Sequence, residues 1–245
     1  MSPSRQLLPL LSSLGNSRWA LTRTLRSDNP LDLNGELRGT ATFTPLPNTA
    51  NRDWVYSEEG EIPSSVSGGA AQAGLRWTKK YIWRDGDAGR ISVWFVKIAP
   101  GPDEADYLFH NFDFADATIG PEVSSQGEEQ GKTMEEGKAE LITPPTPPAI
   151  TTTDAETTVL MARGNHLCIN DMYRTAYAFR IQSETGEVLS WASRHVVRGP
   201  KKNQDIINRY ERALPLERKP VIFQSLYLLP FASTSCNSAK LILAL

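Results

Sequence analysis

Apolar and polar residues alternate along much of the chain, with the two-residue period of a β-strand. At 35–43, for example, Leu37, Gly39, Ala41 and Phe43 share one face, and mostly polar side chains occupy the other. Similar β patterns recur at 54–59, 75–84, 90–98, 106–114, 158–162, 164–181, 188–198 and 203–212. Short strands at this spacing predict an all-β fold of about eight strands, an antiparallel meander closed into a barrel.

A short helix is predicted before the first strand. Leu7, Leu10, Leu11 and Leu14 recur at helical spacing, and Gly15 stands where a helix would end. The apolar run Leu7 to Leu11 is short, contains Pro9 and lacks a small-x-small cleavage site, which argues against a signal peptide. We therefore expect a helix that packs on the barrel.

Two segments depart from the strand pattern. Residues 115–158 are acidic, rich in Gly, Ser, Pro and Thr, and almost without aromatic residues, which predicts a disordered insertion within a single domain spanning 1–212. The tail, 213–245, has apolar runs that are too short to span a membrane. We interpret it as an appendage, either an extra docked strand or loose sequence.

Composition and charge exclude several classes of function. The 245 residues are 40% hydrophobic and carry a net charge of −2, which gives a sizeable core and no basic field for nucleic acid. Two cysteines cannot form a disulfide framework, so a reducing, cytoplasmic location is expected. No metal or cofactor motif is present, and the segment 199–202 lacks the residues of a phosphate-binding loop.

The segment from Gly164 to Tyr173 carries the richest chemistry. His166 and Cys168 share one phase of a strand, and Asp171 and Tyr173 share the other, so both sets face inward only if a bulge intervenes near Asn170. One interpretation makes His166, Asp171 and Tyr173 acid–base groups in a pocket. The other makes them buried polar groups with structural partners. Cys168 is expected to be a small buried hydrophobe.

A second candidate is the strand that contains Tyr56 and Glu58, which share a face. A Glu58 carboxyl inside an apolar barrel would have a raised pKa and could act as a general acid. Aromatic and polar residues on other strands are predicted to line the same ligand pocket, and Lys201 to contribute an anion contact at the rim. The predicted binding set comprises Tyr56, Trp77, Tyr81, Trp83, Phe95, His110, Cys168, Tyr177, Trp191 and Lys201.

Several of these pieces together resemble a family of domains of unknown function from bacteria and ascomycete fungi. The resemblance rests on Leu14-Gly15…Trp19…Arg23, Gly39-x-Ala41-x-Phe43, Tyr56-x-Glu58-x-Gly60, His166-x-Cys168-x-x-Asp171-x-Tyr173, Gly199-Pro-Lys-Lys202 and Tyr210-x-Arg212, and it covers roughly residues 10–212 without the insertion. It implies a lipocalin-like barrel and no assigned reaction. By analogy with lipocalins, Trp19 would plug one end of the barrel beneath Arg209 or Arg212.

Three functions follow as hypotheses. The first is binding of a small, largely apolar molecule in the barrel. The second is a cofactor-free isomerase or cyclase of fungal secondary metabolism that uses His166, Asp171, Tyr173 and Glu58. The third is a protein-interaction module that acts through the acidic insertion. A carboxylate and a histidine converging inside a cavity would favour chemistry, and an all-apolar lining would favour carriage.

Overall fold

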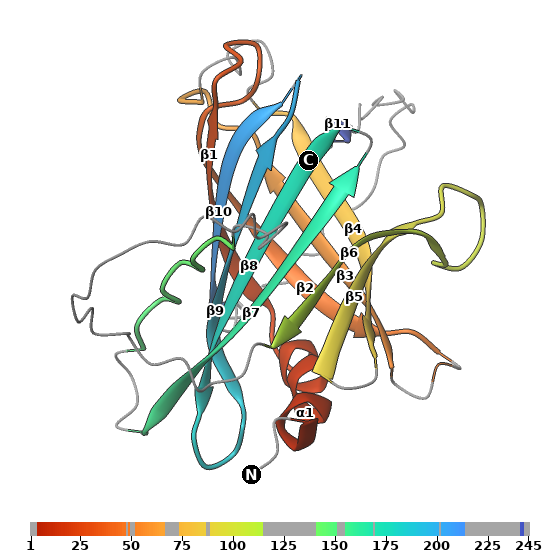
Figure 1. The fold of residues 1–245 in the computed structure, drawn as a ribbon, viewed down its shortest axis with the longest axis vertical. Helices are drawn as coiled ribbons and strands as arrows, with labels where there is room; N and C mark the ends of the chain where they lie inside the picture. The colour runs from red at the N-terminus through yellow and green to blue at the C-terminus, as the bar shows by residue number, and fades with distance from the viewer. Residues whose placement is uncertain are drawn as a thin grey trace, which may run out of the picture.

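The fold is a closed antiparallel barrel of ten strands with a short helix at its N-terminus (Figure 1). The computed structural model describes residues 4–47, 49, 52–66, 74–86, 89–114, 141–150, 155–168, 170–200, 202–213 and 241–242. The elements are α1 (Ser4–Gly15), β1 (Trp19–Ser27), β2 (Gly35–Pro45), β3 (Asp53–Glu61), β4 (Arg76–Asp85), β5 (Arg90–Val96), β6 (Ala105–Phe114), β7 (Thr157–Cys168), β8 (Asp171–Gln182), β9 (Val188–Arg198), β10 (Asn203–Arg212) and β11 (Leu241–Ile242).

Each barrel strand pairs with its neighbours in sequence, and the pairing of β1 with β10 closes the ring. β1 pairs with β10 over its full length, from Trp19 opposite Arg212 to Ser27 opposite Gln204. β4 pairs with both β3 and β5. The all-β barrel class predicted from the alternation is therefore confirmed, with ten barrel strands where about eight were expected.

Helix α1 lies at one end of the barrel and closes it (Figure 1). Leu10, Leu11 and Leu14 are buried there, and the indole Nε1 of Trp19 donates a hydrogen bond of 2.9 Å to the carbonyl oxygen of Leu14. Trp19 is fully buried, as a plug would be. The arginine expected to stack on Trp19 is not among its described contacts. Arg212 instead binds the carbonyl oxygen of Val188 and the carboxylate of Glu187.

The opposite end, which we call the mouth, carries the β1–β2, β7–β8 and β9–β10 connections (Figure 1). The sequence 164–181, interpreted above as one run, belongs to two strands, because β7 ends at Cys168 and β8 begins at Asp171. Cys168 pairs with Asp171, and His166 with Tyr173, so this antiparallel pairing puts all four residues in one phase without the expected bulge.

Part of the predicted insertion lies against the barrel. Residues 141–150 run outside β7, β8 and β9, where the Oγ of Ser190 donates to the carbonyl oxygen of Pro148 at 2.6 Å and Arg180 donates to the same oxygen at 3.2 Å. Pro144 and Pro147 are buried. Residues 115–140 and 151–154, which include most of the acidic segment, lie outside the described residues.

Little of the tail is described. β11 pairs in parallel with β4, Leu241 opposite Trp77 and Ile242 opposite Thr78, which is the arrangement of a docked strand. Across the described part of the chain, no helix has the length and apolar character needed to cross a membrane.

Candidate functional site

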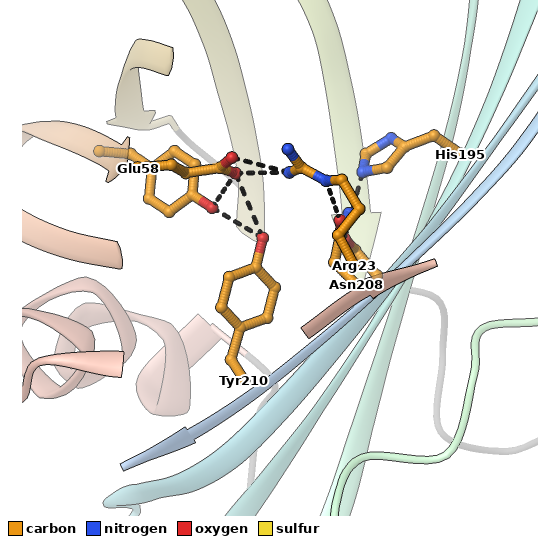
Figure 2. Close-up of polar contacts among 7 residues, drawn as sticks. Arg23, Glu58, His195, Asn208 and Tyr210 are labelled. Atoms are coloured by element: carbon orange, nitrogen blue, oxygen red, sulfur yellow. Dashed lines mark hydrogen bonds and ion pairs between the residues drawn. The ribbon is translucent and has the colours of Figure 1, made fainter. Parts of the chain in front are cut away.

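An ion pair crosses the interior of the barrel. Arg23 on β1 donates from Nη2 to both carboxylate oxygens of Glu58 on β3, at 2.8 and 2.7 Å. Both side chains are almost completely buried, with 4% and 3% of their surface exposed. Figure 2 shows the guanidinium pointing at the carboxylate across the space between the strands.

Two tyrosine hydroxyls complete the surroundings of this carboxylate. The hydroxyl of Tyr56 donates to Oε1 of Glu58, and the hydroxyl of Tyr210 lies 2.7 Å from that of Tyr56 and 3.4 Å from the same oxygen. Figure 2 shows the Tyr210 hydroxyl turned toward the Glu58 carboxylate. The ring of Tyr210 stacks flat on Trp191, with 3.5 Å between the ring centroids. The aromatic core therefore fixes the position of the hydroxyl that faces Glu58.

The guanidinium is held from two further directions. Its Nε donates to Oδ1 of Asn208 at 2.6 Å, and Asn208 donates from Nδ2 to the Oγ of Ser193 at 2.9 Å. Its carbon lies 5.4 Å from the ring centroid of Trp77. Gly39 and Gly60 make room for that indole, because a Cβ at either position would lie within 3.0 Å of the ring.

Two histidines lie in the same part of the barrel. Nε2 of His110 lies 2.8 Å from the hydroxyl of Tyr177, and Nε2 of His195 lies 3.1 Å from the Oγ of Ser193. Three buried nitrogens in this group have no hydrogen-bond partner among the described residues: Nη1 of Arg23, Nδ1 of His110 and Nδ1 of His195. A buried polar nitrogen without a partner is costly, so these nitrogens are points at which a bound molecule would be favoured.

Burial and neighbouring charges shift the pKa values of the titratable groups in this site. Burial acts to raise the pKa of Glu58, but Arg23, Lys79 and the Tyr56 hydroxyl together leave it below its ordinary value. The raised pKa expected for Glu58 is therefore wrong, because the sequence pattern does not reveal the facing arginine. A catalytic role for Glu58 stays a prediction. Burial lowers the pKa of His110 to about 3 and also lowers that of His195, so both imidazoles are neutral near pH 7.

Two cavities meet at this network. The inner cavity is small, about 30 Å³, and is bordered by Arg23, Glu58 and the two histidines. The mouth cavity is larger, about 110 Å³, and lies between β1, β2, β4 and β10, where Leu25, Leu33, Leu37 and Ile206 form apolar walls. Arg23 and Lys79 line both cavities.

The structure brings half of the predicted site together. Seven predicted residues line the inner cavity: Tyr56, Glu58, Tyr81, Trp83, His110, Tyr177 and Trp191. Trp77 is buried beneath Arg23, and Phe95 stacks on Tyr107 beside an outer groove. Lys201 lies outside the described residues.

The motif at the β7–β8 turn lies at the mouth and apart from these cavities. Cys168 is exposed, which corrects the expectation that it is buried, because the turn carries it beyond the packed part of the barrel. His166 is partly buried, with its ring 6.3 Å from that of Tyr173. The Tyr173 hydroxyl accepts a hydrogen bond of 2.9 Å from Nζ of Lys202.

The residues that sequence reasoning missed are polar groups on inward-facing positions: Arg23, Lys79, Ser193, His195, Asn208 and Tyr210. A signal for them exists. Lys79 shares the face of Trp77, Tyr81 and Trp83, and His195 shares the phase of Trp191 and Val197. Polar residues within an otherwise apolar phase, as at Lys79 and His195, are the pattern that marks such positions.

A comparison with known protein families finds a match, which extends from the end of α1 to the end of β10. A model of a family of unknown function, DUF6314, matches residues 16–131 and 147–212. The chain belongs to DUF6314. No curated protein and no solved structure matches it. The match covers all ten barrel strands of this DUF6314 member, including every residue of the Arg23–Glu58 network.

Within the described ranges, no three His, Cys, Asp or Glu side chains are grouped closely enough to hold a metal ion.

Proposed function

We propose that this DUF6314 member binds a small molecule in the half of the barrel nearest the mouth, and that the molecule presents a hydrogen-bond acceptor or an anionic group to Arg23. The observation that carries the proposal is the guanidinium itself. It is 4% exposed, it lines both cavities, and its Nη1 has no partner among the described residues.

The lining supports a polar head group rather than a wholly apolar ligand. Aromatic rings fill the barrel towards α1, whereas Arg23, Glu58, Lys79 and the two histidines border the inner cavity. The mouth cavity adds leucine and isoleucine walls. A few convergent polar groups against apolar walls are typical of small-molecule sites. The expected ligand therefore has a compact apolar body and one carboxylate, enolate or carbonyl group.

Titration with benzoate, with benzyl alcohol as the uncharged comparison, tests this proposal. Tryptophan emission is a suitable signal because Trp83 and Trp191 line the inner cavity. Benzoate should change the emission saturably, and benzyl alcohol should bind at least about tenfold more weakly, a difference of about 1.4 kcal/mol.

The variant Arg23→Lys supplies the specificity test, because it keeps a cation beside Glu58 and removes the fork of donors. It should weaken benzoate binding. Its matched control is Arg194→Lys, the same change at the ion pair with Asp205 on the outer wall. Binding that is absent for benzoate, or that is equal in both variants, would refute the proposal.

A second candidate function is cofactor-free acid–base catalysis. It is favoured by the grouping of Glu58, Lys79, His110 and His195 around one cavity. Burial makes both imidazoles weak bases, so the amine of Lys79 would then be the proton acceptor. Deuterium exchange at the α-carbon of a ketone, followed by NMR with wild type and Lys79→Met, would distinguish catalysis from binding alone.

A further inference from the structure

Lys79 occupies an unusual position in the barrel. It lies on the inward face of β4 directly opposite Glu58 of β3, and it lines the inner cavity, the mouth cavity and the groove outside β4. Its side chain is partly buried. Among the residues that the structure describes, none forms a hydrogen bond or an ion pair with its amino group, although interior lysines are usually paired.

The neighbouring lysine provides an internal comparison. Lys80, the next residue, points outward and binds both carboxylate oxygens of Asp103 at 3.0 Å. The two lysines are adjacent on the same strand, so the difference between their amines lies in their surroundings. Lys79 faces a cavity beside a second cation, Arg23, and Lys80 faces solvent and a carboxylate.

These surroundings favour the neutral amine. Burial and then repulsion from Arg23 lower the pKa of Lys79 to about 7, while Glu58 acts in the opposite direction. His195 is the other titratable group that interacts with it, and it is neutral near pH 7. At pH 7 the neutral, nucleophilic form of the amine is therefore much more populated at Lys79 than at an ordinary lysine.

We propose that Lys79 captures the carbonyl carbon of a small aldehyde or ketone as an imine, an inference that rests on the proposed small-molecule function and names its chemical class. The amine nitrogen adds to the carbonyl carbon, a proton moves from nitrogen to oxygen, and the resulting carbinolamine loses water to form the C=N bond. One water is released and no oxidant or reductant is consumed.

The surrounding residues suit this product. The Glu58 carboxylate, across the strand pair from Lys79, is the counter-ion for a protonated imine. The mouth cavity accommodates the body of the carbonyl compound between Leu25, Leu37 and Ile206, with Lys79 at its base beside Arg23. The released water leaves through the same cavity.

Reductive trapping tests the inference. The protein is incubated with benzaldehyde and sodium cyanoborohydride at pH 7, and peptide mass spectrometry locates the added benzyl groups. Lys79 should be labelled at least about tenfold faster than Lys80. The fast phase should disappear in Lys79→Met and Lys79→Arg, and it should persist in the matched control Lys80→Met.

The outcomes separate this inference from the proposed function. Equal labelling of all lysines, with benzoate binding intact, would overturn imine capture and leave the binding site standing. Equal labelling without benzoate binding would overturn both. Selective labelling of Lys79 without benzoate binding would support imine capture and refute the anion site at Arg23.

Discussion

Replacing Arg23 with methionine should destabilise the protein far more than a typical substitution. Methionine keeps an unbranched apolar stem against Trp77, so the change removes the guanidinium and its bonds to Glu58 and Asn208. A buried carboxylate is left without its principal counter-ion. Breaking a buried ion pair by removing one partner costs about 3–5 kcal/mol.

The structure places the expected value near the lower end of that range. The Tyr56 hydroxyl still donates to Glu58, and the charge of Lys79 still acts on it. We therefore expect a loss of about 3 kcal/mol at pH 7, a large fraction of the roughly 5–15 kcal/mol that stabilises an ordinary domain. The double variant Arg23→Met/Glu58→Gln removes both charges and should be more stable than Arg23→Met alone.

The dependence on pH provides the sharper test. In the wild type the pKa of folded Glu58 lies below its ordinary 4.5, so the pair stabilises the fold above that pH and loses its effect as the pH falls through the folded value. Without Arg23, burial becomes the dominant influence and raises the pKa of folded Glu58. In the folded variant Glu58 is then protonated at low pH, and the stability of the variant falls as the pH rises through this raised pKa.

The penalty of Arg23→Met should therefore be larger at pH 7 than at pH 4.5. Urea unfolding of wild type, both variants and Arg90→Met at the two pH values measures it. Arg90 serves as the control because its partner Asp113 is exposed, so its removal should change little at either pH. An equal penalty at both pH values, or no recovery in the double variant, would refute the reasoning.

Three further predictions concern other parts of the chain. Replacing 115–140 with a short Gly/Ser linker should leave the thermal midpoint nearly unchanged, because closure entropy depends weakly on loop length; a large fall would show that the segment is packed. The stability of the wild type should fall between pH 6.5 and about pH 3 because folded His110 resists protonation, and His110→Phe should reduce that slope by about one proton in urea titrations. His166→Ala and Asp171→Asn should leave benzoate affinity unchanged and change the free energy of unfolding by only about 0.5 kcal/mol, because both residues lie partly exposed at the mouth. Weaker benzoate binding in either variant would show that these residues belong to the binding site.

The alternation of apolar and polar residues predicts the barrel well because strand faces repeat every second residue. Strands β9 and β10 have the expected bounds, and Leu37, Ala41 and Phe43 are buried on the expected face. The reversal between Cys168 and Asp171 was missed because the run 164–181 contains no Pro or Gly after its first residue to mark it. Strand β1 was missed because Arg23 interrupts the apolar phase formed by Trp19, Leu21 and Leu25.

The site was predicted only in part because its partners come from distant strands. Tyr56 and Glu58 were expected to share an inward face, and they do. The residue that decides the charge of Glu58 is Arg23, 35 positions earlier, and the one that anchors Arg23 is Asn208, 185 positions later. The two-residue alternation of a strand assigns each residue to a face of the sheet, but it does not show which charged residue of a distant strand lies opposite.

Stability alone does not account for the polar half of the barrel. A buried ion pair is often no more stabilising than apolar side chains of similar volume, and the aromatic half towards α1 shows that this chain packs such side chains closely. Nη1 of Arg23 and Nδ1 of both buried histidines add a cost, because their hydrogen-bonding capacity is unused among the described residues. A molecule that binds those nitrogens would recover this cost on binding. The same groups that weaken the fold thus favour the ligand, and this coupling predicts that a true ligand raises the thermal midpoint more in wild type than in Arg23→Lys.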